Sequence, residues 1–182
     1  MLNKIGLKYG LIGFTIYALY IIIGWQVSLS ILINPLIGFA LGLMVVGLGI
    51  YSQLDARKKN GGFLDFTYIL QVYMITVIIA IMGYYITSVV IFNFVDPAAS
   101  KEIMRLTVEQ SMGMMESLFG MMGQKDAMEN MDQEILQQAM EDAPNPFGPT
   151  IILSFIFSVM MYTVIGLISA AVLRKDEPVP FH

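Results

Sequence analysis

The sequence predicts an all-α membrane protein: a bundle of four transmembrane helices with an amphipathic helical hairpin outside the cytoplasm. Composition is the first observation, because 57% of the 182 residues are hydrophobic and only 13% are charged, against about 25% charged residues in soluble domains. The second is a set of four apolar stretches, each long enough to cross a bilayer. The third is one acidic, methionine-rich segment before the last of these stretches. Together they exclude an ordinary soluble globule.

The four apolar stretches are the predicted spans. None contains a charged side chain, and each has the roughly 20 residues that a helix needs to cross the hydrocarbon core. Because apolar and polar residues do not alternate along them, they predict helices rather than barrel strands. We expect the spans at about residues 9–29, 33–53, 69–95 and 150–173, within a single membrane domain that covers residues 1–182.

Positive charges indicate the orientation. Seven of the ten Lys and Arg residues lie before the first span, between the second and third, or after the fourth. Since cytoplasmic loops are rich in Lys and Arg, both termini are predicted to be cytoplasmic and residues 96–149 to be outside. The amino end also imitates a secretory signal peptide, with the small-x-small triplet at residues 28–30. Its cleavage would leave the other three spans oriented in the same way.

The segment over residues 96–149 predicts the external hairpin. It holds ten of the fourteen acidic residues and nine of the fifteen methionines. Asp96 can accept the free amide hydrogens of a first helical turn, and Pro97 loses no hydrogen bond at the first helical position. A helix is therefore expected from Pro97 to about Met122, with its apolar residues on one half and its charged residues on the other. A second helix is expected over 126–141, and a proline-rich stretch over 143–149 closes the hairpin.

The methionines of this hairpin allow two interpretations. Thioether sulfur is a soft ligand that suits Cu(I), and the spacing of Met112, Met115, Met128 and Met131 could bring sulfurs together. Methionine is also a flexible core filler and a good helix former. The methionines of the first helix fall in its apolar half, which favours packing or an adaptable partner surface.

A group of hydroxyl-bearing residues falls near the middle of the predicted membrane. Tyrosine prefers the membrane interface, so hydroxyls at this depth need partners. They either form a hydrogen-bonded cluster that ties the helices together, or line a pocket for the polar head of a lipid or quinone-like molecule. The residues are Tyr17, Tyr20, Tyr84, Tyr85, Tyr162 and Thr163.

Small residues at helical spacing predict close helix contacts. Gly38 and Gly42 form a G-x-x-x-G motif in the second span, and a similar series of glycines lies at the start of the first span, at positions 6, 10 and 13. Such residues let helices approach closely, either within the bundle or between copies of the chain. Amides near the span ends, among them Gln53, are expected to be interfacial or capping groups.

Composition also restricts the function. The net charge of −4 provides no basic surface for nucleic acid, and with no cysteine and a single terminal histidine, His182, most metal and acid–base chemistry is excluded. We therefore expect no enzymatic activity and no cofactor. The leading hypothesis is a membrane scaffold or accessory subunit whose hairpin docks a membrane-protein partner or a second copy. A small oligomeric transporter or channel for an apolar or weakly polar molecule is the alternative, and Cu(I) handling is a third.

Five landmarks occur in a characteristic order: the opening LKYGLIGF, the turn GGFLDF, the FVDP that ends the third span, the acidic excursion, and a last span that runs into LISAAVLRKDE. In this order the chain resembles a family of small bacterial membrane proteins, domain of unknown function 4199, common in the Bacteroidetes. The resemblance implies four spans and a location in the inner membrane. It implies no activity, substrate or catalytic residue. Asp65, in the GGFLDF turn, is a candidate cap of the third span.

Overall fold

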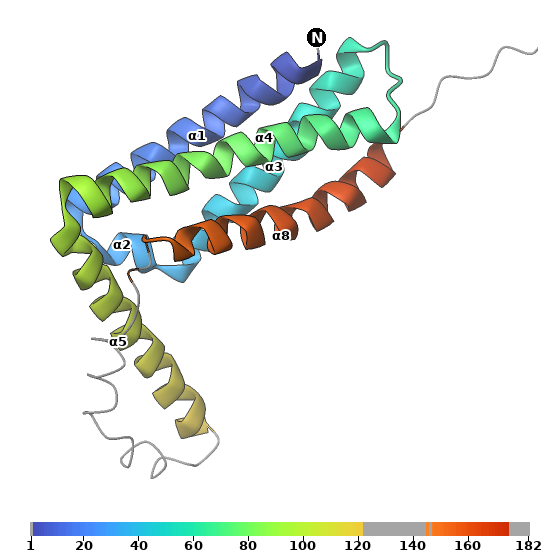
Figure 1. The fold of residues 1–182 in the computed structure, drawn as a ribbon. Coiled ribbons are helices and arrows are strands. Elements are labelled where there is room, and N and C mark those ends of the chain that lie inside the picture. Colours follow the sequence, from blue (N-terminus) through green and yellow to red (C-terminus); the bar gives the residue numbers. More distant parts are fainter. Residues whose placement is uncertain (1, 122–144, 146, 175–182) are drawn as a thin grey trace, which may run out of the picture.

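The structure, a computed structural model, describes residues 2–121, 145 and 147–174, and these contain helices and no strand (Figure 1). Four of the helices are long and apolar enough to cross a membrane, so the all-α transmembrane fold class is confirmed. Of the predicted hairpin, the first helix lies in the described part, whereas the second, expected over 126–141, lies outside it. The elements are α1 (Leu2–Val27), α2 (Ser30–Ile33), α3 (Pro35–Lys59), α4 (Phe66–Val89), the π-helical turn η1 (Val90–Val95), α5 (Pro97–Met121) and α8 (Thr150–Leu173).

The last helix, α8, coincides with the apolar stretch that predicts it, whereas α1 begins seven residues earlier than expected and α3 ends later than expected. This helix begins at Pro35 and continues six residues past the expected end at 53, to Lys59. Hydropathy follows the thickness of the bilayer, whereas backbone hydrogen bonding continues the helix into the polar region, where basic residues in the last turn favour the negative end of the helix dipole. At its start, the Asn34 side chain accepts a hydrogen bond from the Leu36 amide at 3.0 Å. Asp65 caps α4 in the same way, accepting from the Tyr68 amide at 3.1 Å.

The tight pairing of α1 with α4 depends on glycine. The two helices lie side by side along their length (Figure 1). A Cβ atom on Gly10 would lie 2.8 Å from Ile79, and one on Gly13 would lie 2.5 Å from Ala80. In return, a Cβ on Gly83 would meet the backbone of Phe14 at 2.4 Å. The early glycines of the first span thus set the distance between α1 and α4.

The glycines predicted to pack in the second span behave differently. A Cβ on Gly42 would lie 3.4 Å from the Tyr162 hydroxyl, but one on Gly38 would have no atom of a described residue within 4 Å. The expectation of close packing within the bundle is therefore wrong for Gly38, which leaves contact between copies as its alternative. Gly38 and Gly49 lie on nearly the same face of α3, about three turns apart, but the buried residues of α3 all lie in its later part, at Val45 and beyond.

A sharp corner joins α4 to α5. The chain leaves α4 through η1, and α5 then runs at a steep angle to the bundle, beside α2 (Figure 1). Pro97 is the first residue of α5, and Asp96 Oδ1 accepts a hydrogen bond from the Ala99 amide at 3.2 Å. Trp25 Nε1 donates to the other carboxylate oxygen of Asp96 at 3.0 Å. These bonds tie the corner to the end of α1. We call the end of the bundle where α1 ends, α8 begins and α5 lies across the helices the α5 end.

Candidate functional site

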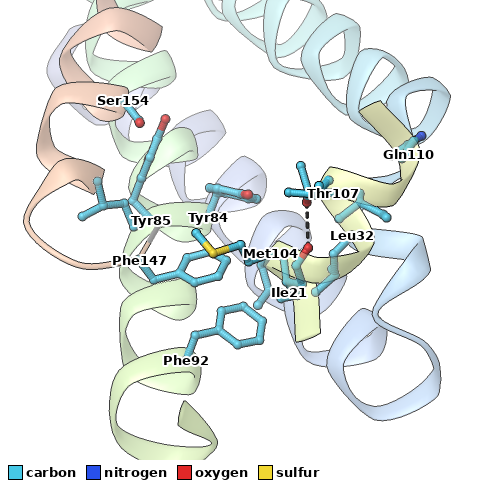
Figure 2. A pocket seen from close by; sticks show the side chains of 14 residues that line it. Ile21, Leu32, Tyr84, Tyr85, Phe92, Met104, Thr107, Gln110, Phe147 and Ser154 are labelled. Carbon is cyan, nitrogen blue, oxygen red and sulfur yellow. Dashed lines mark hydrogen bonds between the residues drawn. The ribbon is translucent and has the colours of Figure 1, made fainter. Parts of the chain in front are cut away.

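A pocket of about 510 Å³ lies at the α5 end of the bundle, and we call it the α5 pocket (Figure 2). One side is formed by α5, and the other by the adjacent parts of α1, α2, α4 and α8. Most of the lining that the structure describes is apolar, with five hydroxyl- or amide-bearing side chains and no Asp, Glu, Lys or Arg. The lining residues are Ile21, Leu32, Ile33, Tyr84, Tyr85, Phe92, Ile103, Met104, Thr107, Val108, Gln110, Phe147, Ile151 and Ser154.

Buried aromatic packing holds the wall of the pocket that leads into α8. The rings of Phe92 and Phe147 stack with their centroids 4.4 Å apart, and both side chains are buried. Asn93 Nδ2 donates to the Phe147 carbonyl at 2.7 Å, and Asn145 Nδ2 donates to Asn93 Oδ1 at 3.0 Å. These bonds attach the end of the proline-rich stretch to η1. The pocket is therefore bounded by well-packed groups on this side.

The polar groups of the lining differ in their partners. Thr107 Oγ1 donates to the Ile103 carbonyl one turn back in α5 at 2.7 Å, so its hydrogen bond is already made. The Tyr84 hydroxyl points from α4 into the pocket, whereas Ser154 and Gln110 lie at opposite edges (Figure 2). Tyr84, Ser154 and Gln110 make no side-chain hydrogen bond to any residue that the structure describes. They are free to bond a ligand.

Four of the predicted tyrosines come together beside this pocket. The rings of Tyr17 and Tyr84 meet edge to face with centroids 5.8 Å apart, and those of Tyr84 and Tyr85 at 5.2 Å. Tyr17 is buried, and Tyr162 from α8 packs against the same buried cluster. The Tyr85 hydroxyl shares a 2.8 Å hydrogen bond with the Ser158 hydroxyl. The cluster thus ties α1, α4 and α8 together and also provides part of the pocket wall.

The other two predicted residues have local roles. Tyr20 donates to the Ile31 carbonyl at 2.9 Å, which fastens α1 to α2. Thr163 Oγ1 donates to the Val159 carbonyl one turn back at 2.7 Å and lies 3.5 Å from the sulfur of Met74. Neither residue lines the α5 pocket.

A second hollow, of about 310 Å³, lies between α4 and α8, and we call it the α4–α8 groove. Its lining is apolar apart from the Tyr85 hydroxyl. Tyr85 and Ile151 line both the groove and the α5 pocket. The remaining groove residues are Met82, Ile86, Val89, Val90, Ile152 and Phe155.

Comparison with known proteins places the chain in a family. The family model for a protein of unknown function, DUF4199, matches residues 4–175. The chain belongs to the DUF4199 family. No curated protein and no solved structure matches it. The resemblance indicated by the motif order of this DUF4199 protein is thereby confirmed.

Sequence reasoning missed a buried polar region of this DUF4199 protein, where α3 meets α4. Tyr73 and Gln53 are both fully buried, and the Tyr73 hydroxyl and Gln53 Oε1 have no partner among the described residues. Gln53 Nε2 donates to the Ile69 carbonyl at 3.4 Å. The expected interfacial role of Gln53 is wrong, because α3 continues beyond it and α4 covers it. Since Tyr73 is one of four tyrosines in α4, only its neighbours in space distinguish it.

The copper candidates fall largely outside the described residues. Met112 lies on α5 and is half-buried, but the side chain of Met115 and the whole of Met128 and Met131 are not part of the description. Within the part of the DUF4199 chain that is described, no group of three His, Cys, Asp or Glu residues is placed to hold a metal ion. The Cu(I) hypothesis therefore stays a prediction.

Proposed function

We propose that this protein binds an uncharged, lipid-like amphiphile in the α5 pocket. The observation that carries the proposal is the Tyr84 hydroxyl, which points without a described partner into a largely apolar cavity. Small-molecule sites are typically cavities of about 300–1,000 Å³ with apolar walls and a few polar groups that orient the ligand. A polar group left unpaired away from water costs about 1–3 kcal/mol, so a ligand hydroxyl or carbonyl beside Tyr84 stabilises the complex.

The ligand is uncharged because the pocket provides no counter-charge. Among the described residues, no acidic or basic side chain lines it. An ion moved into such surroundings without a partner is disfavoured far more than a neutral polar group. A head group with hydroxyl or carbonyl oxygens fits this lining, whereas a phosphate or ammonium group does not.

The proposal includes an orientation and a role. The distribution of Lys and Arg favours cytoplasmic termini, and in that orientation the α5 pocket faces the outer leaflet of the membrane. The role we propose is binding or carriage and not catalysis, since the described lining contains no His, Cys or carboxylate that could act as nucleophile or base. Flux of a bound lipid in proteoliposomes separates carriage from binding alone.

Native mass spectrometry of the gently extracted protein tests the binding. Val108 lines the pocket from α5, and Ser111 is exposed on the same helix and does not line it. Val108→Trp fills the pocket and should abolish the mass of co-purifying lipid, whereas Ser111→Trp adds the same ring to the same helix and should leave it unchanged. Tyr84→Phe should lower retention of a hydroxyl-bearing lipid such as diacylglycerol. Wild-type protein that neither carries nor takes up such a lipid would contradict the proposal.

A scaffold role is a second candidate, supported by the far half of α5. Met114 is 52% exposed and Met121 is 85% exposed, although both belong to the predicted apolar half of the helix. Met114→Glu together with Met121→Glu should abolish association with a partner protein or a second copy, while Ser111→Glu should not. The same mass spectra report this result, because a foreign subunit and a second copy have masses unlike that of a lipid.

A further inference from the structure

We infer that the α5 pocket and the α4–α8 groove are two parts of one site: the pocket holds the polar head of the ligand, and the groove holds its hydrocarbon tail. The ligand then enters sideways from the bilayer, between α4 and α8. This inference rests on the proposed function and adds to it the class of ligand and the direction of access.

The two hollows share a wall. Tyr85 and Ile151 line both of them, so the end of the groove is also the edge of the pocket. Tyr85 is held in place, because its hydroxyl is hydrogen-bonded to Ser158 at 2.8 Å and its ring packs edge to face on Phe155 at 5.3 Å. Figure 2 shows Tyr85 at the α8 side of the pocket, beside Ser154. The two hollows are therefore neighbours on either side of Tyr85, and one elongated molecule could contact both.

The lining of the groove suits a hydrocarbon chain. Its one polar group, the Tyr85 hydroxyl, already has a partner in Ser158, so the groove presents no polar group that awaits a bond. All of its residues belong to α4, η1 and the beginning of α8, within the helices that can cross a membrane. Val90 is 46% exposed and Ile152 is 63% exposed, so the groove is open on the side that faces hydrocarbon. In a bilayer, the neighbour of such a surface is a lipid tail.

The pocket has polar groups free to bond a ligand and the groove has none, and this difference indicates the class of ligand. A tail gains little free energy by leaving other lipid tails for an apolar groove, because both surroundings are equally apolar. Selection must therefore come from the head, through Tyr84 and the polar groups at the edges of the pocket, while the groove aligns the tail. The ligand is a lipid with one or more hydrocarbon chains and a head that bears hydroxyl or carbonyl oxygens but no charge.

Two photoreactive diacylglycerols test the inference with the full chain in proteoliposomes. One carries a diazirine at the glycerol end and the other at the end of an acyl chain, and the labelled peptides are mapped by mass spectrometry. The glycerol probe should label α5 around Met104 and Val108. The chain-end probe should label the groove at Val90 and Ile152. A phospholipid with the same chain-end diazirine and a charged head should leave the groove labelled no more than any other lipid-exposed surface.

Adjacent residues of α8 provide a matched pair of variants. Ile152 lines the groove, and Leu153, which is 71% exposed, does not. Ile152→Trp should remove the chain-end labelling of Val90, whereas Leu153→Trp should leave it unchanged. If Ile152→Trp does not fold, Val90→Phe replaces it, because this smaller change fills the groove from its other side. The chain-end labelling of Ile152 should then be lost in Val90→Phe.

The outcomes separate the inference from the proposed function. If the glycerol probe labels α5 but the chain-end probe labels the groove no more than it labels Leu153, the ligand lies wholly in the pocket and the inference is overturned. If the glycerol probe does not label α5, the proposed function fails as well. If Ile152→Trp releases a bound protein and leaves the labelling intact, the groove is a protein interface and the inference is again overturned.

Discussion

At the scale of single residues, the packing of α3, α4 and α8 converges on one tyrosine. Tyr73 is fully buried, and its ring lies against two glycines from different helices. A Cβ atom would come within 2.5 Å of the ring if placed on Gly49 and within 2.6 Å if placed on Gly166. Added volume at either glycine must displace the ring or the helices.

Gly49→Ala should therefore destabilise the protein, by about 1–3 kcal/mol, as is usual when a well-packed core receives an extra methyl group. Gly47 lies on the same helix, and a Cβ atom placed on it would have no atom within 4 Å, so Gly47→Ala should be neutral or stabilising by about 0.5–1 kcal/mol through helix propensity. Unfolding in detergent, followed by circular dichroism, measures both. Equal effects of the two substitutions would mean that Tyr73 does not pack as the structure describes.

Asp96 is a second residue with a wide effect, since it joins two helices. Its carboxylate accepts hydrogen bonds from Trp25 Nε1 and from the Ala99 amide. These bonds stabilise the charged form, so they hold the pKa of Asp96 below its usual range, with the bond from Trp25 as the largest cause. Acid should therefore weaken the corner between α1 and α5.

The direction of this pH dependence follows from linkage. A carboxyl group in the unfolded chain has a pKa of about 3.9, so the contribution of Asp96 is fully present above about pH 5 and is lost as the pH falls through the lower folded value. Trp25 is the only tryptophan in the chain, and its fluorescence should change over that range. Asp96→Asn, which does not titrate, should lack the transition. A transition that persists unchanged in the variant would assign it to another group.

At the scale of secondary-structure elements, α5 has two unlike halves. Near its start, Ala99 and Ile103 are each only 6% exposed and pack among the ends of α1, η1 and α8. On its charged face, Arg105 pairs with Glu102 at 2.6 Å and also with Glu109. The pairing lowers the pKa of Glu102 and raises that of Arg105, but these side chains are nearly half exposed, where ion pairs contribute little. Buried apolar residues, and not the ion pairs of Arg105, therefore hold α5 on the bundle.

Ile103→Ala should thus loosen α5 far more than Arg105→Ala does. Truncation of a buried isoleucine costs about 2–5 kcal/mol, because it removes apolar contacts and leaves a cavity. Hydrogen exchange of α5 amides, compared between the two variants, measures the difference. Faster exchange in Arg105→Ala than in Ile103→Ala would contradict this assignment.

At the scale of the whole molecule, the orientation of the bundle decides which compartment faces the α5 pocket. The loop between α3 and α4 contains Asn60, at the opposite end of α4 from α5 (Figure 1). Arg57 in the last turn of α3 donates hydrogen bonds to the Gly62 carbonyl and to the Leu173 carbonyl at the end of α8. The cationic end of the bundle is therefore a defined part of the fold, and the positive-inside rule predicts that it is cytoplasmic.

Because the chain has no cysteine, single-cysteine variants report this orientation without background labelling. Asn60 and Ser111 are both exposed, at opposite ends of the bundle. In spheroplasts, Ser111→Cys should react with a membrane-impermeant maleimide, whereas Asn60→Cys should react only after lysis. The reverse pattern would put the α5 pocket on the cytoplasmic side and would exclude an outer-leaflet ligand.

Structural features that depend on residues close together in the chain could be predicted from the sequence. The four long apolar helices, the start of α5 after Asp96-Pro97 and the cap at Asp65 all follow from apolar runs and from hydrogen bonds between residues a few positions apart. The sequence also showed which tyrosines fall at a similar depth in the membrane, and four of them are in one cluster in the structure. These features need no knowledge of how the helices are arranged.

Only the tertiary structure decided which face of each helix is buried. An apolar helix carries no sign of where its neighbours lie, so hydropathy does not distinguish Gly38, which has no described atom close by, from Gly49 on the same face, which fits against Tyr73. For the same reason, nothing in the sequence separates Tyr20, which bonds the backbone of α2, from Tyr84, which points into the α5 pocket. The pocket and the groove exist because α4, α5 and α8 meet at one end of the bundle, and that meeting joins residues far apart in the chain.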